Sequence, residues 1–560
     1  MALGSAHLRR GMWVCAMLTI LATHTTYIPN GFAWLDHGDV VDGRAILPFS
    51  QILSAFVTPF GETSFYRPLV TLTLSADSAL YGDRAWGFHL TNVLLHAGAC
   101  AAFFWAGRKL ITLPAWMLGC GLVVAGVHPL SWLPVGAISY RPDLLAVLFT
   151  FLALGCYEEV RRKRGATWWL VGLAGSTALA FLSKETALFW VPALCVLREL
   201  QGDSRQKSSS LGVSVVAGLL VVYAVVRYAV VPEGWSRTAV PLSFVEGVAT
   251  RLGALTRQLI HVVDPRLPEL SDAMPILGFG WMAFAGGVAL IAMMVGSLRW
   301  RDGRVGWFLG FCLIALLPSL NLVPLPRFTS PHYGYLLSFA LGLAVVLIVD
   351  RLHRSGSDWH RWGFVGLALW VLGAGVSTYR GGTRFADDAT LFGVAVAVDP
   401  RFLEGHHYLG EAASRQGDFE RAAKHFQASL KFWDDTIAYV DWFAASSGLA
   451  EVRVRQGRYA EADRLLLALQ EHAEGSRLRS IVYNRAVVAQ RQERHADAVD
   501  LLVTEPWDRP EPILLLARSL SVLGKIKEAV IQMERVVPLV DEARQSHVKV
   551  MIQSMKEGVR

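Results

Sequence analysis

The sequence predicts an all-α protein in which a polytopic membrane domain is followed by an α-solenoid of helix pairs. Of its 560 residues, 53% are hydrophobic and only 18% are charged, a balance that is too apolar for a soluble protein of this size. Long apolar runs recur up to about residue 378 and then stop, and small residues at helical spacing follow them. We therefore expect a membrane domain over residues 1–380 and a helical repeat domain over residues 384–560.

Eleven apolar stretches make up the predicted membrane domain, because each is long enough, or nearly so, to cross a bilayer as a helix of about 20 residues. The first stretch follows Arg9-Arg10, as in a secretory signal, but no small-residue cleavage site follows it before Pro29, so we interpret it as a retained span. The predicted spans are 12–28, 90–107, 113–135, 143–158, 166–182, 186–198, 210–231, 276–297, 305–323, 334–350 and 362–378.

The placement of Lys and Arg predicts the orientation, because cytoplasmic loops are enriched in these residues. Clusters of cations fall at every second loop, which places the N-terminus in the cytoplasm and the repeat domain outside it, in a bacterial inner membrane or its equivalent. The long first external loop, 29–89, then lies on the same side as the repeats, with the loops 136–142, 183–185, 232–275 and 324–333. The clusters are Arg9-Arg10, Arg108-Lys109, Arg161 to Arg164, Arg198 to Lys207, Arg299 to Arg304 and Arg351 to Arg361.

The net charge of +7 does not indicate nucleic-acid binding, because the cations lie in short clusters between apolar runs and not along one continuous face. The six cysteines fall inside or beside apolar runs, without paired spacing. Neither a disulfide framework nor a zinc site is therefore predicted.

The repeat domain is predicted from a recurring pattern of helix, tight turn and helix, with small residues where two helices touch. Equivalent alanines at 422, 462, 498 and 529 are spaced around the 34-residue tetratricopeptide period. An amphipathic stretch over 541–557 is suited to cap such a stack. The stack is either purely structural or presents a concave surface to a protein or peptide. The first two repeats are Leu409-Gly410, Gly417, Phe419, Ala422 and Phe426, then Leu449-Ala450, Gly457, Tyr459, Ala462 and Leu466.

Polar and ionisable residues gather at the far-side ends of the predicted spans, where they are costly unless paired or hydrated. Some have ordinary explanations, since His89 and Asn92 could hydrogen-bond neighbouring helices and Lys184-Glu185 could form an exposed turn. Their convergence on one leaflet nevertheless indicates a functional site. The candidates are Asp36, Asp39, Arg67, His89, Asn92, His128, Arg141, Asp143, Lys184, Glu185, Arg327, His332 and Tyr333.

This combination of residue types suits one kind of chemistry. A carboxylate on an external loop can act as a general base that removes a proton from an acceptor hydroxyl. Cations at the membrane boundary can bind and neutralise a phosphate leaving group, and arginine does so bidentately. A phosphate joined to a group apolar enough to lie between helices describes a lipid-phosphate donor. The residues therefore predict glycosyl transfer from a polyprenyl-phosphate sugar to a hydroxyl group.

The order of these motifs resembles that of the GT-C glycosyltransferases. Within them, it looks most like the transmembrane and tetratricopeptide-repeat O-mannosyltransferases and their bacterial relatives. The resemblance covers nearly the whole chain, because those proteins also end in repeats outside the cytoplasm. The motifs are Trp34-Leu35-Asp36-His37-Gly38-Asp39, Phe65-Tyr66-Arg67-Pro68-Leu69, Phe88 to His96, His128-Pro129, Arg141-Pro142-Asp143 and Lys184-Glu185.

The resemblance implies a GT-C-like membrane domain that transfers a hexose such as mannose to protein Ser or Thr, with inversion. It also implies that an acid of the first external loop is the catalytic base, a role that we assign to Asp36, with Asp39 as the second candidate. Residues that would contact the donor phosphate or shape its pocket are Arg67, His89, Arg141 and Lys184.

The chain departs from the family pattern in two places. Family members often carry two adjacent acids, whereas here His37-Gly38 separates Asp36 from Asp39. Many also carry a Glu five residues after the His of the His-Pro motif, where this chain has Leu133. These departures leave open which acid is the base and which sugar or acceptor is used.

The predicted partners are a polyprenyl-phosphate-linked sugar, the lipid bilayer and an acceptor protein or peptide that the repeats recruit. No cofactor is predicted. A divalent metal is not favoured, because the nearby cations already suit a monophosphate. The alternative function is a membrane-anchored scaffold whose repeats bind envelope proteins without catalysis. A transporter is less consistent with the sequence, because the charges lie at one leaflet and not at the midplane.

Overall fold

The computed structural model describes residues 2–61, 63–162, 167–200, 210–231, 242–301, 303–322, 325–355 and 359–557. Two of the cation clusters from which the orientation was predicted lie partly outside these ranges, at residues 163–166 and 201–207. The chain divides into two compact units. The first runs to Phe402 and also includes the later segment Trp433–Tyr439. The second comprises Leu403–Phe432 and the chain from Val440 onward.

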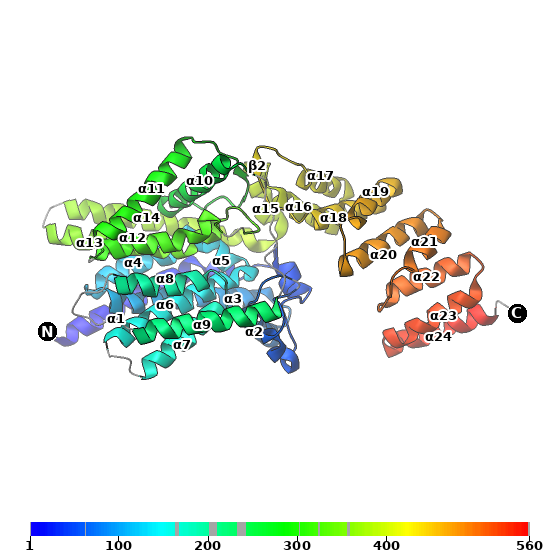
Figure 1. Cartoon of the computed structure of the whole chain (residues 1–560), viewed down its shortest axis with the longest axis horizontal. Helices are drawn as coiled ribbons and strands as arrows, with labels where there is room; N and C mark the ends of the chain where they lie inside the picture. Colours follow the sequence, from blue (N-terminus) through cyan, green and yellow to red (C-terminus); the bar gives the residue numbers. More distant parts are fainter. Residues whose placement is uncertain are drawn as a thin grey trace. The chain divides into compact units, whose positions relative to one another are not determined.

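The first unit is a bundle of helices, of which α2, α10 and α15 lie outside the predicted spans (Figure 1). Each predicted span overlaps at least one helix. Its helices are α1 (Ala2–Thr23), α2 (Pro68–Tyr81), α3 (Ala85–Leu110), α4 (Ala115–Val127), α5 (Trp132–Gly136), α6 (Arg141–Arg162), α7 (Thr167–Phe181), α8 (Ala187–Leu200), α9 (Ser210–Val230), α10 (Phe244–Val263), α11 (Trp281–Arg299), α12 (Arg304–Leu316), α13 (Tyr335–Ser355), α14 (Trp359–Gly382) and α15 (Asp388–Val398).

The apolar helices make this an integral membrane protein, although the predicted count of eleven spans is not confirmed. Within the described ranges, five helices are long and apolar enough to cross a bilayer, and a sixth span arises if a bent pair is counted as one. The bent pair falls in the predicted span 113–135: α4 ends at Val127, and Pro129–Gly136 continues at 50° to it. Pro129 accounts for the break, since proline has no N–H to donate and obstructs the preceding turn.

Close helix contacts at small residues hold the bundle together. A Cβ atom on Gly121 of α4 would collide with the carbonyl oxygen of Gly342 of α13, and the reverse is also true. The two backbones can therefore approach closely, as small residues allow between membrane helices. Beside them, the rings of Phe103, Phe151 and Phe339 pack in contact, with centroids 5.0–5.3 Å apart.

Two amphipathic segments of the first unit lie outside the predicted spans. The first is α10, which begins with a capping box in which Ser243 and Glu246 satisfy each other's backbone N–H groups. The second contains a 3₁₀ helix, Phe49–Phe56, with Phe49 and Leu53 exposed by 89% and 78%. An apolar face of this kind suits the membrane interface.

A two-stranded antiparallel sheet is the β structure found in the described ranges. Strand β1 (Met274–Pro275) pairs with β2 (Thr436–Ile437), so that Met274 faces Ile437 and Pro275 faces Thr436. Both strands belong to the first unit, although the sequence around β2 belongs to the second.

The second unit is a series of helix pairs with the predicted small residues at their contacts. The four alanines at equivalent positions, 422, 462, 498 and 529, are all fully buried. The ring of Phe426 fills the space beside Gly410, as the sequence pattern predicted. The pairs are α16 (Leu403–Arg415) with α17 (Phe419–Ser429), α18 (Trp442–Arg455) with α19 (Tyr459–Gln470), α20 (Gly475–Arg491) with α21 (His495–Leu502), and α22 (Pro510–Val522) with α23 (Ile526–Val536); α24 (Glu542–Glu557) follows them.

The turn inside each helix pair has the same backbone conformation in all four pairs, although its residue type differs in one of them. Gly417, Gly457 and Gly524 each end the first helix of their pair with a positive φ of 74–79°. In the third pair Glu493 occupies the same place, with φ 60°. In all four turns the next residue donates its N–H to a carbonyl five residues earlier, which is the Schellman arrangement. A non-glycine residue is strained in this conformation.

We expect Glu493→Gly to stabilise the second unit by about 1 kcal/mol, because glycine adopts the left-handed conformation without a Cβ clash. Gly524→Glu, the same exchange in reverse at the next turn, should destabilise it by a similar amount. Urea unfolding followed by proteolysis of the second unit would measure both changes. Equal stability of the two variants and the native chain would contradict this account.

Candidate functional site

Seven of the predicted site residues line one cavity of about 310 Å³ in the first unit. The cavity is bounded by the start of α6, the turn between α7 and α8, the segment after α12 and the start of α13. Apolar side chains complete its wall, among them Phe65, Phe189 and Leu322. Phe189 is 49% exposed and Leu322 68% exposed. The seven predicted residues are Arg67, Asp143, Lys184, Glu185, Arg327, His332 and Tyr333.

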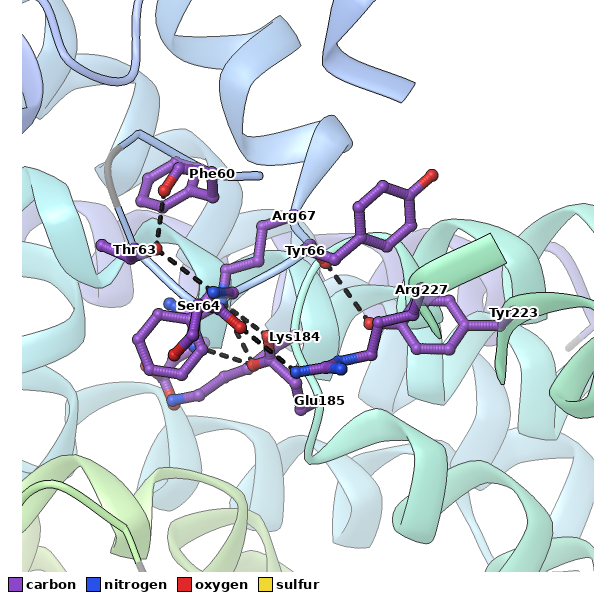
Figure 2. Close-up of polar contacts among 11 residues, drawn as sticks. Phe60, Thr63, Ser64, Tyr66, Arg67, Lys184, Glu185, Tyr223 and Arg227 are labelled. Atoms are coloured by element: carbon purple, nitrogen blue, oxygen red, sulfur yellow. Dashed lines mark hydrogen bonds and ion pairs between the residues drawn. The ribbon is translucent and has the colours of Figure 1, made fainter. Parts of the chain in front are cut away.

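Two largely buried ion pairs form the polar side of the cavity, and Figure 2 shows the pair between Arg67 and Glu185. Arg67 donates to Glu185 through Nη2 at 2.7 Å and through Nε at 3.1 Å. Lys184 Nζ lies 2.6 Å from Asp143 Oδ1. Since buried charges are costly unless they are paired, these contacts explain why adjacent residues of opposite charge stand in the turn between α7 and α8. The predicted alternative, an exposed turn, is wrong, because Lys184 and Glu185 are 9% and 6% exposed.

The residues that line the cavity include one more cation than carboxylate. Arg67, Lys184 and Arg327 line it together with the carboxylates Asp143 and Glu185, so three cations face two anions. Such a site is electrostatically suited to a ligand with a single negative charge.

Helix α9 positions the segment that carries Arg67. Arg227 donates to the carbonyl of Ser64 at 3.2 Å, and the Tyr223 hydroxyl donates to the carbonyl of Tyr66 at 3.3 Å, as Figure 2 shows. The guanidinium of Arg67 also lies over the Phe65 ring, 4.0 Å from its centroid. Sequence reasoning missed Tyr223 and Arg227. In the sequence, these two residues stand out only as polar side chains near the end of the predicted span 210–231.

Two aromatic rings contact the guanidinium of Arg327. Its guanidinium carbon lies 5.1 Å from the ring centroid of Trp34 and 5.0 Å from that of Tyr439. Its carbonyl accepts a hydrogen bond from the Tyr333 hydroxyl at 2.8 Å. These contacts hold the cation at the edge of the cavity, within the range of cation–π attraction.

Asp36 lies directly behind the cavity wall. Its Oδ1 accepts the backbone N–H of Ser139 at 2.8 Å, and Ser139 lines the cavity. The side chain is buried, and its Oδ2 accepts no hydrogen bond from the described residues. Burial raises the pKa of Asp36 to about 7, although the Ser139 N–H opposes this change.

Asp39 is the more accessible of the two acids, because it is only half-buried. Burial raises its pKa as well, while the guanidinium groups of Arg67 and Arg44 act in the opposite direction. Asp39 is therefore close enough to Arg67 to interact with a residue of the cavity. The geometry leaves both acids as candidates for the base.

Asp388 holds the acidic loop in place and was not predicted. Its Oδ1 accepts the backbone N–H of Trp34 at 2.7 Å, and its Oδ2 lies 2.9 Å from His37 Nε2. Trp34 has a positive φ of 61°, a conformation that is costly for a bulky residue and needs support from its surroundings. Asp388 supplies part of this support on both sides of Asp36. No sequence pattern indicated that residues 350 positions apart would meet.

The remaining predicted residues lie outside the cavity lining and make contacts between helices. His89 Nε2 lies 2.9 Å from the carbonyl oxygen of Gly31. Arg141 donates to Asn92 at 2.8 Å and to Asp77 at 2.5 Å. Although Arg141 and Asp143 are only two residues apart in sequence, Arg141 pairs with Asp77 on α2 and Asp143 pairs with Lys184.

His128 also lies apart from the cavity lining. Its Nε2 is 2.8 Å from the carbonyl oxygen of Val262, and its Nδ1 accepts the N–H of Leu130. Both ring nitrogens are thus engaged with the backbone. A substrate-binding role for His128, His89, Asn92 and Arg141 stays a prediction.

No metal site is apparent in the part of the chain that the structure describes, where no three His, Cys, Asp or Glu side chains are grouped to hold an ion. All six cysteines are free.

The fold and the cavity define an integral membrane protein with an additional helical repeat unit. No protein-family model matches the chain. Its sequence is similar to Protein O-mannosyl-transferase Tmtc3 of Drosophila melanogaster, with 22% identity over 558 residues that cover 80% of this chain and 58% of that protein. Protein O-mannosyl-transferase TMTC2 of Mus musculus is 30% identical over 177 residues, which cover 30% of this chain and 21% of that protein. These sequence similarities confirm the predicted resemblance to the O-mannosyltransferases.

The chain spans about a fifth to three fifths of the length of these relatives. Among solved structures, ArnT from Cupriavidus metallidurans bound to undecaprenyl phosphate is similar with a TM-score of 0.39 and 15% identity, covering 88% of this chain and 89% of that chain.

We expect Asp388→Ala to loosen the acidic loop, because the buried N–H of Trp34 loses its acceptor, a loss of about 1–3 kcal/mol. Amide hydrogen exchange over residues 34–41 should accelerate about tenfold or more. Asp42→Ala is the matched control, since its ion pair with Arg44 is exposed and contributes little. Unchanged exchange in Asp388→Ala would show that the loop does not depend on this carboxylate.

Proposed function

We propose that the protein is an integral membrane glycosyltransferase that transfers a hexose such as mannose from a polyprenyl-phosphate donor to a hydroxyl group of a protein Ser or Thr. The observation that carries this proposal is the cavity, in which Arg67, Lys184 and Arg327 meet an apolar wall beside two acids with raised pKa values. The sequence similarity to protein O-mannosyl-transferases supports the reaction class.

The charge of the cavity suits such a donor. A sugar joined to a polyprenyl phosphate is a phosphodiester with one negative charge, which matches the excess of one cation among the lining residues. When the bond between the anomeric carbon and the phosphate oxygen breaks, the electron pair leaves with the phosphate, which gains a second charge. Arg67, Lys184 and Arg327 would stabilise this developing charge in a site of low dielectric constant.

The apolar wall suits the lipid part of the donor. Phe189 and Leu322 both line the cavity and are 49% and 68% exposed, so the apolar lining continues to the surface of the unit. An isoprenyl chain could therefore leave the cavity beside α8 and remain in the bilayer.

The acceptor hydroxyl needs a base, which we assign to the acidic pair of the first external loop. Asp36 or Asp39 removes the hydroxyl proton while the oxygen attacks the anomeric carbon from the side opposite the phosphate. This single displacement inverts the configuration at that carbon. Asp36 has the pKa that suits a base near neutral pH, and Asp39 is the more accessible carboxylate.

The acceptor side of the reaction is assigned to the repeat unit. It contains a polar groove of about 340 Å³ with Asp463, Arg485, Arg494 and Asp497 in its lining, to which a peptide could bind.

For the acceptor to be a secreted or envelope protein, the repeats must lie outside the cytoplasm, as the cation clusters predict. Protease added to intact spheroplasts should then digest the second unit, and protection of that unit would contradict the orientation.

We expect Asp36→Asn to reduce transfer at least a hundredfold, since an amide cannot accept the proton, while expression and thermal stability stay near those of the native chain. Glycan mass spectrometry of envelope proteins would show loss of a hexose mass from a defined Ser or Thr. Asp42→Asn, an exposed acid on the same loop, is the control. Loss of transfer in Asp39→Asn with full activity in Asp36→Asn would move the base to Asp39, and no glycan change in either would favour the scaffold.

The pH profile gives a separate test of the base. Only the ionised carboxylate can accept a proton, and the pKa of Asp36 is about 7. Transfer should therefore be slow below pH 6, rise through pH 7 and level off above it. A profile that is flat between pH 5.5 and 8 would contradict the assignment of Asp36.

A further inference from the structure

An apolar groove adjoins the cavity of the first unit. It has a volume of about 450 Å³ and is lined by residues from the first half of α10, the second half of α11 and the end of α12 with the turn that follows it. Leu317 and Leu322 line both the groove and the cavity. Because the two share part of their walls, the apolar lining of the cavity continues into the groove.

The shared wall is the segment 317–322, which follows α12. Its 3₁₀ helix, Leu317–Leu320, ends at Asn321, which has a left-handed φ of 47°, a conformation that asparagine tolerates better than most residues. The Asn321 side chain accepts the N–H of Leu325 at 2.9 Å and donates to the carbonyl of Phe328 at 3.3 Å. These hydrogen bonds fix the turn that places Leu322 at the junction of cavity and groove.

Helices α11 and α12 come into close contact at the other end of the groove. A Cβ atom on Gly296 of α11 would collide with the side chain of Leu309 of α12, and close approach at small residues is typical of membrane helices. This contact lies within about one turn of Met294 and Leu313, which both line the groove. With a rise of about 1.5 Å per residue, Leu313 lies about 6 Å along the chain of α12 from the shared wall. The groove therefore follows the seam between the two helices.

The chemistry of the groove suits a hydrocarbon. In the part of the chain that the structure describes, Arg251 is the one charged residue of the lining. It donates to the carbonyl of Gly247 at 2.8 Å and to that of Asn321 at 3.4 Å. The other lining residues are leucine, isoleucine, valine and methionine, whose flexible or branched side chains adapt to an irregular apolar chain. Met294 is 50% exposed, so the groove is open along its side.

We propose that this groove binds the first isoprene units of the donor, so that its polyprenyl chain leaves the cavity along the seam of α11 and α12. The inference rests on the proposed function, since it takes the phosphate to be bound by the cations of the cavity. The cavity also opens beside Phe189 of α8. The route along α12 is preferred because the apolar lining there continues beyond the cavity. Binding then depends on chain length, since only a chain of several isoprene units reaches Met294.

The test compares the binding of geranylgeranyl phosphate, with four isoprene units, and dimethylallyl phosphate, with one, to the full chain in detergent by calorimetry. Met294→Trp should weaken binding of geranylgeranyl phosphate about fivefold or more, because the larger side chain occupies the space that the lipid enters. Binding of dimethylallyl phosphate should stay unchanged. Val295→Trp is the matched control, since Val295 is the next residue of α11, is 58% exposed and is not part of the groove lining.

A second measurement locates the lipid directly in the native chain and does not depend on any variant. Geranylgeranyl phosphate with a diazirine at the end of its chain is bound and photolysed, and mass spectrometry identifies the labelled peptides. Labels are expected on α11 between Leu290 and Met294 and on α12 between Leu313 and Leu317. Labels confined to α8 around Phe189 would overturn the proposed route.

The two measurements also separate this inference from the proposed function. If the native chain binds both phosphates and Met294→Trp weakens neither, or weakens both equally, the groove does not hold the donor chain, while the phosphate site stands. If the native chain binds neither phosphate, the cavity is not a lipid-phosphate site. The proposed function then falls, and the assignment of the groove falls with it.

Discussion

The first unit depends on one constraint, namely that charges placed among membrane helices must be paired. Four of the charged residues that line the cavity obey it, since Arg67 pairs with Glu185 and Lys184 with Asp143. Each pair joins segments that are far apart in sequence, so the electrostatic requirement also fixes which elements meet. Removing one partner of such a pair is costly because the other charge stays buried. The need to pair these charges therefore brings together the segments that line the cavity.

Helix α6 shows the same constraint at both of its ends. At its start, Arg141 is fully buried and pairs with Asp77 of α2. At its other end, Glu158 is fully buried and pairs with Arg198 of α8 at 2.9 Å. The apolar middle of the helix packs without such pairs. Ionic contacts thus fix the two ends of α6 against different neighbours, while the interior is held by close packing.

The loop that carries Asp36 and Asp39 is held in place by Asp388, which lies about 350 residues further along the chain. Asp388, in the first turn of α15, holds Trp34 and His37 on either side of Asp36. Trp34 in turn contacts Arg327, which Tyr439 contacts as well. The loop that carries the candidate base and the cation of the candidate donor site are therefore parts of one connected set of contacts. A change in any of these residues is expected to affect both halves of the proposed reaction.

The sequence determined the features that depend on local pattern. Apolar runs located most helices of the first unit, since each predicted span overlaps a helix. Small residues at repeat spacing located the helix pairs, and the buried alanines at 422, 462, 498 and 529 confirm them. These features were predictable because burial of a helix face is written into the periodicity of its own residues.

The tertiary structure alone decided which charges pair and which predicted residues share the cavity. No local sequence pattern around Arg141 indicated that its ion-pair partner would be Asp77 and not Asp143. Likewise, no pattern near residue 36 indicated that Asp388 would hydrogen-bond to this loop. The placement of Trp433–Tyr439 could not be predicted either, because this segment lies between repeat helices in the sequence but belongs to the membrane unit in the structure. The sequence by itself therefore determined the kinds of element and the side chains available for chemistry. Their partners depend on contacts across hundreds of residues, which local periodicity does not encode.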